Sequence, residues 1–152
     1  MRLLVGLVSI GLFTSSCFAA PAAQYTGGLC FTSTSDQCQE FWTTDTCFSV
    51  RYAPRNVGSN GPATRLSMFS GTFAIGFALP TGNPIGDVKE VSASKIAIGG
   101  YSFPMGFRFI SQSPTSPISS TANITFVGTF TNFDEIENCT VNFRGAVTKR
   151  EF

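Results

Sequence analysis

The stretch that decides the fold is TFVGTFTNF, residues 125–133, in which bulky apolar side chains alternate with threonines around a central glycine. Alternation with a period of two is typical of a β-strand that buries one of its faces. Phe126, Gly128 and Phe130 share one face, and the threonines share the other. Rows of phenylalanine in strands usually face a protein's own core, so we expect these rings to be buried.

A second strand, residues 139–149, follows after the short segment DEIEN, so the two strands should form an antiparallel hairpin. Its own inward face carries valines, a phenylalanine and a glycine. A slip of one residue would expose every phenylalanine, and only registers that match the two apolar faces are allowed. One allowed register sets Gly128 opposite Gly145 and Phe130 opposite Phe143, and it gives the two glycines a use as a gap in the inner face.

The same alternation recurs along the chain between clusters of Gly, Pro, Asn and Ser, and no stretch has a sustained helical period. Further strands are expected at residues 25–32, 42–52, 65–70, 72–80, 88–91, 96–98 and 101–111. Pro104 cannot donate a ladder hydrogen bond, which predicts an edge strand or a bulge there. We expect an all-β protein, a single-domain antiparallel β-sandwich of the immunoglobulin-like or jelly-roll type over residues 24–152. A small closed β-barrel is the alternative.

The first residues have the composition of a secretory signal peptide: a basic Arg2, an apolar run at residues 3–13, and then small residues. We expect residues 1–19 to be removed, with cleavage between 19 and 23. The apolar run is too short to span a membrane. Cys17 lacks an apolar residue three positions before it, so we expect no lipid anchor. The sequence thus predicts a secreted or periplasmic protein without a transmembrane segment.

Removal of the leader leaves four cysteines, which are Cys30, Cys38, Cys47 and Cys139. An even number in an exported chain predicts two disulfides, and three pairings remain open. Three of the four precede residue 48, so one bridge must join the N-terminal part to Cys139. Closing a loop of that length stabilises a fold by about 4 kcal/mol.

The composition excludes several functions. The chain of 152 residues contains no histidine and no phosphate-binding or dinucleotide-binding motif, so we expect no cofactor. Only 12% of residues are charged, and loss of Arg2 leaves 10 − 1 = 9 basic against 9 acidic residues, which argues against nucleic-acid binding. We expect no enzymatic activity, because only a hydrolase based on paired carboxylates remains chemically available.

Two loops concentrate charge. One, RYAPRNVGSNGPATR, could bind an anion or a partner through its arginines, which are Arg51, Arg55 and Arg65. The other, NFDEIENC, could bind calcium weakly through Asp134, Glu135 and Glu137. Ordinary solvated loops are the alternative for both, and their opposite charges would also suit head-to-tail contacts between subunits. Two glycosylation sequons begin at Asn123 and Asn138.

Three functions therefore compete. The first is an exported, non-enzymatic binding or surface-assembly protein, whose partner is a protein or cell surface or a second copy of the chain. The second is a small barrel that binds an apolar ligand in a phenylalanine-lined pocket, made by Phe103, Phe107, Phe126, Phe130 and Phe143. The third is the carboxylate-dependent hydrolase. The sequence favours the first.

Overall fold

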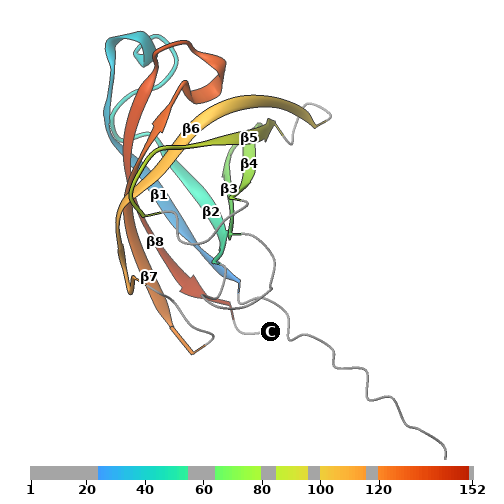
Figure 1. Ribbon diagram of the computed structural model, residues 1–152, viewed down its shortest axis with the longest axis vertical. Helices are drawn as coiled ribbons and strands as arrows, with labels where there is room; N and C mark the ends of the chain where they lie inside the picture. Colours follow the sequence, from blue (N-terminus) through green and yellow to red (C-terminus); the bar gives the residue numbers. More distant parts are fainter. Residues whose placement is uncertain (1–23, 55–63, 80–84, 96–99, 116–119, 151–152) are drawn as a thin grey trace, which may run out of the picture.

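Eight antiparallel strands close into a barrel in a computed structural model, which describes residues 24–54, 64–79, 85–95, 100–115 and 120–150 (Figure 1). Each strand pairs with its neighbour in sequence, and the last pairs with the first. The strands are β1 (Tyr25–Thr34), β2 (Cys47–Ala53), β3 (Thr64–Ser70), β4 (Phe73–Leu79), β5 (Lys89–Lys95), β6 (Tyr101–Ser113), β7 (Asn123–Thr131) and β8 (Thr140–Lys149). Two 3-10 turns, η1 (Asp36–Cys38) and η3 (Phe133–Glu135), interrupt the loops. The predicted leader and Arg55 lie outside the described residues.

The all-β, antiparallel prediction is confirmed, and the sheet takes the closed-barrel alternative instead of the sandwich that the sequence favoured. The closing contact is long, because β1 and β8 pair from Tyr25 opposite Lys149 to Thr34 opposite Val141. Both architectures need strands with one buried face, so an alternating pattern is equally compatible with either. Only the pairing of the first strand with the last distinguishes them.

The β7–β8 hairpin has the predicted faces but a different register. Gly128 lies opposite Phe143, and Gly145 lies opposite Phe126, so the predicted glycine–glycine pairing is wrong by two residues. A Cβ added at either glycine would overlap the ring of the phenylalanine that faces it. Each ring therefore lies over an opposing glycine. A shift of two residues keeps both apolar faces inward, which is why the sequence pattern could not distinguish these registers.

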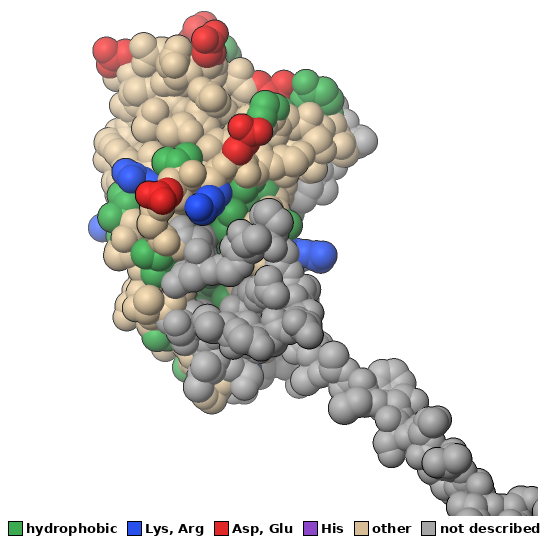
Figure 2. Space-filling model, in the orientation of Figure 1, with side chains coloured by type: hydrophobic (Ala, Val, Ile, Leu, Met, Phe, Trp, Pro, Cys, Tyr) green, Lys and Arg blue, Asp and Glu red, His purple; other side chains and the backbone are tan. Residues whose placement is uncertain are grey.

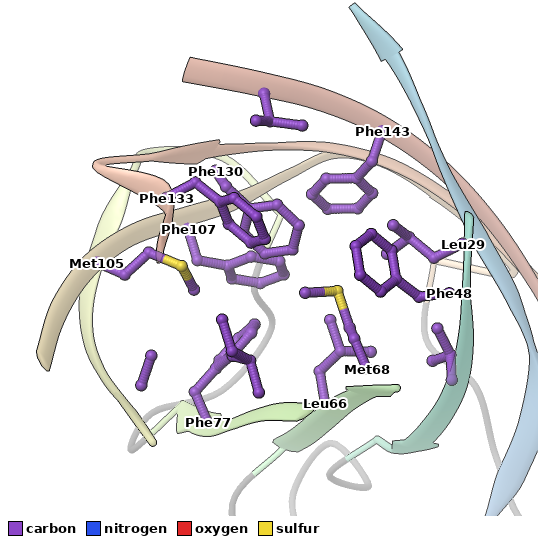
Figure 3. Packing of buried hydrophobic residues seen from close by; sticks show 14 of the residues in the cluster. Leu29, Phe48, Leu66, Met68, Phe77, Met105, Phe107, Phe130, Phe133 and Phe143 are labelled. Carbon is purple, nitrogen blue, oxygen red and sulfur yellow. The ribbon is translucent and has the colours of Figure 1, made fainter. Parts of the chain in front are cut away.

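Phenylalanine rings fill much of the barrel (Figure 3). The ring centroids of Phe130 and Phe143 lie 4.4 Å apart, and those of Phe107 and Phe109 lie 4.8 Å apart. At the end formed by the β1–β2 and β7–β8 loops, Trp42 packs against Phe73 with a centroid distance of 4.7 Å. We call this the disulfide end, and its two loops lie side by side at the top of Figure 1. Aromatic packing thus closes this end of the barrel.

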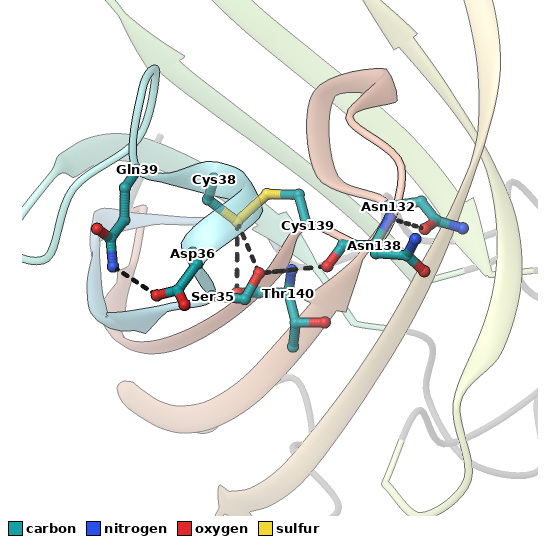
Figure 4. Close-up of a disulfide and its surroundings, with 8 residues drawn as sticks. All are labelled: Ser35, Asp36, Cys38, Gln39, Asn132, Asn138, Cys139 and Thr140. Carbon is teal, nitrogen blue, oxygen red and sulfur yellow. Dashed lines mark hydrogen bonds between the residues drawn. A yellow bond between two sulfur atoms is a disulfide. The ribbon is translucent and has the colours of Figure 1, made fainter.

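Two disulfides confirm the prediction from cysteine count. Cys30–Cys47 links residues that face each other on β1 and β2, and Cys38–Cys139 links η1 to the residue before β8 across 101 positions. Beside the second bridge, the Ser35 hydroxyl donates to the carbonyl of Asn138 and accepts from the Thr140 backbone N–H (Figure 4). The long bridge therefore ties the β1–β2 loop to the β7–β8 loop.

Three local predictions need correction. The strand expected at 42–52 begins only at Cys47, because residues before it form a turn that carries Trp42 into the core. Strand β5 (Lys89–Lys95) extends beyond the strand expected at 88–91, and the strand expected at 96–98 lies outside the described part. Pro104 lies within β6, opposite Ser92 of β5, where β6 is not yet paired with β7. The strand is locally one-sided there, although the barrel has no edge strand.

Candidate functional site

The residues of the predicted apolar pocket all belong to the buried core. Phe103, Phe107, Phe126, Phe130 and Phe143 are all buried, with at most 3% of each residue exposed. Phe107 contacts both Phe130 and Phe143, at centroid distances of 5.6 and 6.1 Å, and Phe126 lies 6.3 Å from Phe143. Four of the five rings therefore contact one another as core residues do, and Phe103 lies near the disulfide end under the Lys95 ammonium.

A small polar group lies inside the opposite end of the barrel. The Tyr52 hydroxyl donates to Gln112 Oε1 at 2.7 Å, and Gln112 Nε2 donates to the carbonyls of Pro114 and Thr115. Burial, and then the nearby Tyr25, raise the pKa of Tyr52, so the phenol stays protonated. The Tyr52 hydroxyl and the Gln112 side-chain amide both have hydrogen-bond partners. The arrangement therefore fits a role in stabilising the fold better than a role in proton transfer. Sequence reasoning placed Gln112 in a loop and missed it.

The acidic β7–β8 loop is paired with a cation from β5. Lys95 Nζ lies 2.9 Å from Asp134 Oδ1 and 2.7 Å from Glu135 Oε1, whereas Glu137 makes no ion pair within the described residues. Burial opposes protonation of Lys95, but its hydrogen bonds to Glu135 and Asp134 outweigh that effect and raise its pKa. The same hydrogen bond from Lys95 lowers the pKa of Glu135. Within the described ranges, no group of three potential ligands could hold a metal ion, and weak calcium binding stays a prediction.

Two of the three loop arginines lie on adjacent strands. Arg51 of β2 faces Ser67 of β3, and Arg65 of β3 faces Ala53, so both arginines belong to the outward-facing set. The Arg51 guanidinium lies over the ring of Phe69, 5.5 Å from its centroid. A guanidinium held on an aromatic ring by a cation–π interaction is less available to bind an anion or a partner. Arg55 cannot be placed, because it lies outside the described residues.

A groove on the outside of the barrel was not predicted. It crosses β6, β7, β8 and β1 and has a volume of about 520 Å³. Small side chains and backbone form much of it, and its lining is Gly28, Cys30, Ser111, Gln112, Ser113, Thr125, Phe126, Val127, Arg144, Gly145 and Ala146. We call it the outer groove. Small residues at neighbouring outward positions of β1 and β8 create the depression, since Gly28 pairs with Ala146.

A bulge in β6 places apolar surface near the outer groove. The β6–β7 register shifts between Phe109 and Ser111, which leaves Ile110 as the extra residue. Ile110 is 51% exposed, and Val127, which pairs with Ser111, is 40% exposed. Large apolar side chains exposed together on an otherwise polar surface typically mark an interaction site. The sequence pattern gave no sign of the bulge.

Charge is unevenly distributed over the barrel. Strands β1, β6, β7 and β8 contain no aspartate or glutamate, but they carry Arg108 and Arg144 on outward positions. Neither arginine has an ion pair within the described residues, and Arg108 Nε is buried without a hydrogen-bond partner there. Most acidic side chains visible in Figure 2 lie toward its upper part, at the disulfide end. The four strands that form the outer groove therefore carry arginines but no carboxylate.

Comparison of the chain with known protein families, curated proteins and solved structures found no match. Across the described ranges, no helix is long and apolar enough to cross a membrane. The two disulfides are consistent with a secreted or periplasmic protein.

Proposed function

We propose that this is an exported, non-enzymatic binding or surface-assembly protein that acts through the outside of its barrel. The observation that carries the proposal is the outer groove, with exposed Ile110 and Val127 nearby and Arg144 in its lining. An apolar patch with a charged margin is the usual form of a protein-binding surface. The leader-like sequence and the two disulfides support export.

The interior supports this proposal less directly. Four of the five rings of the predicted pocket contact one another at centroid distances between 4.4 and 6.3 Å, which favours an outside site over a ligand held among those rings. The non-enzymatic part rests on the missing histidine and on the cysteines, all four of which in the mature chain are paired in disulfides and so lack free thiols.

Native mass spectrometry of the unreduced protein, purified from its natural host, tests the proposal. A multimer or a complex with a second protein is the expected result, and a Val127→Glu variant should lose that association while it keeps the fold. A monomer that carries an apolar small molecule, in both the wild type and Val127→Glu, would overturn the proposal and would place the function inside the barrel.

A further inference from the structure

Phe41 is an aromatic side chain held out in solvent. It is 64% exposed, the largest exposed fraction among the large exposed hydrophobic residues of the described part. It lies in the β1–β2 loop at the disulfide end, next to the exposed Glu40 and near Asp36 and Asp45. An exposed phenylalanine gains nothing for the isolated monomer, whereas aromatic anchors contribute strongly to interfaces.

The loop that carries Phe41 is held on both sides. Before it, Cys38 is bonded to Cys139, and after it, Trp42 packs against Phe31, Phe48, Phe73 and Phe133. The backbone N–H groups of Phe41 and Trp42 both donate to the Cys38 carbonyl, at 2.9 and 2.8 Å. A side chain presented on a fixed backbone loses little entropy when it binds. Phe41 is therefore already arranged for contact.

The outer groove complements this loop in both shape and charge. Its volume of about 520 Å³ falls within the range of sites that accept small molecules or aromatic side chains. The groove lies on four strands without carboxylates and includes Arg144, whereas the Phe41 loop carries acidic residues and no basic one. Opposite charges on two apolar surfaces favour one orientation of encounter.

No residue of the Phe41 loop lines the outer groove of its own molecule. The Phe41 loop follows β1 at the disulfide end. The groove, in contrast, extends to Ser113, the last residue of β6, and to Thr125, near the start of β7, toward the opposite end. A surface that fits a different surface on an identical chain produces a heterologous contact, which repeats from copy to copy.

Building on the proposed function, we infer that the protein assembles head to tail, with Phe41 of one copy inserted into the outer groove of the next copy and Glu40 beside Arg144. The occupant is a second copy of this chain because both complementary surfaces are present on it. The contact leaves a free Phe41 loop at one end and a free groove at the other, so assembly continues into rings or filaments. The unpartnered Arg108 near the groove gains an acidic neighbour in this arrangement.

Sedimentation velocity of the mature protein over a concentration series tests the inference. Wild type should form dimers and larger species, and Phe41→Ser should weaken self-association at least tenfold. Tyr101→Ser is the matched control, because Tyr101 is also an exposed aromatic residue, at 57%, and should change nothing. Circular dichroism checks that every variant keeps its fold.

Charge exchange supplies the specific readout. Glu40→Arg and Arg144→Glu should each weaken self-association alone, and the double variant should recover at least part of it. Oligomers that are unaffected by Phe41→Ser and by both charge changes would overturn this contact but leave the proposed function standing. A wild-type protein that stays monomeric at millimolar concentration would overturn self-assembly, and a complex with a different protein in the host would then still support the proposed function.

Discussion

The ring-over-glycine contact in the β7–β8 hairpin makes the Gly145→Ala substitution informative. A Cβ at this position would overlap the ring of Phe126, which is buried in the core, whereas Gly145 itself is half-buried beside the outer groove. Overfilling a packed core costs about 1–3 kcal/mol. Alanine recovers about 0.5–1 kcal/mol, because it restricts the unfolded chain more than glycine does. We expect a net loss of about 1–2 kcal/mol in the free energy of unfolding.

The assay is urea-induced unfolding of the unreduced protein, followed by the fluorescence of Trp42. This is the only tryptophan in the chain, and it packs against core aromatics at the disulfide end. A loss of this size also lowers the melting temperature by about 5 °C for a domain of this length. Both readouts should move together if unfolding is two-state.

Gly28→Ala is the matched control. Gly28 also lies within a strand, but a Cβ there would meet only the Phe48 carbonyl oxygen, at 3.8 Å. We expect no loss of stability from this change. In a Phe126→Leu background the overlap with the ring disappears, so Gly145→Ala should cost at least about 0.5 kcal/mol less than in the wild type. Equal effects of Gly145→Ala and Gly28→Ala, without coupling to Phe126, would refute the view that the ring needs the glycine.

Three further predictions test other parts of the barrel. Tyr52→Phe should cost about 1–3 kcal/mol in urea unfolding, because it leaves the buried Gln112 oxygen without its donor; an unchanged midpoint would contradict this. If the disulfides stabilise through chain entropy, replacing both cysteines of Cys38–Cys139 by alanine should lower the free energy of unfolding by about 4.7 kcal/mol, against about 3 kcal/mol for the shorter Cys30–Cys47 bridge. A larger loss from the shorter bridge would argue against that model. The hydrogen bond from Lys95 lowers the pKa of Glu135 in the folded state, so the ion pair stabilises the fold above pH 4.5, and this contribution is lost as pH falls through the folded pKa. Lys95→Met should therefore flatten the pH dependence of the melting temperature in acid. An unaltered acid profile would show that the pair contributes nothing.

The predictions from sequence succeeded where a local pattern carries the information. The inward faces of the strands follow from alternation, and the buried row at Phe126 and Phe130 is correctly assigned. The even cysteine count predicted two bridges, and the position of Cys139 required one long one. These properties depend on neighbours in the chain or on simple arithmetic.

The predictions from sequence failed where contacts between residues far apart in the sequence determine the structure. A two-residue shift of the β7–β8 register keeps every face, so only three-dimensional packing of Phe143 over Gly128 selects it. Barrel closure depends on β1 meeting β8, which no local pattern reports. The bulge at Ile110 reverses the facing of later residues in β6, so Gln112 is buried although it begins a segment expected to be a loop. The outer groove depends on that bulge and on the barrel surface, and it was missed for the same reason.

The pairing of the first strand with the last also decides when this protein can fold. Tyr25 meets Lys149, its partner 149 − 25 = 124 positions later, so β1 keeps an unpaired edge until β8 has been synthesised. Contacts over such sequence separations form slowly, and open edges invite wrong partners in the meantime. A nascent chain of this protein is therefore an open sheet with two unpaired edges, which closes into a barrel only once β8 has been made. That order suits the export that we propose, and it makes β8 the element whose deletion the fold should tolerate least.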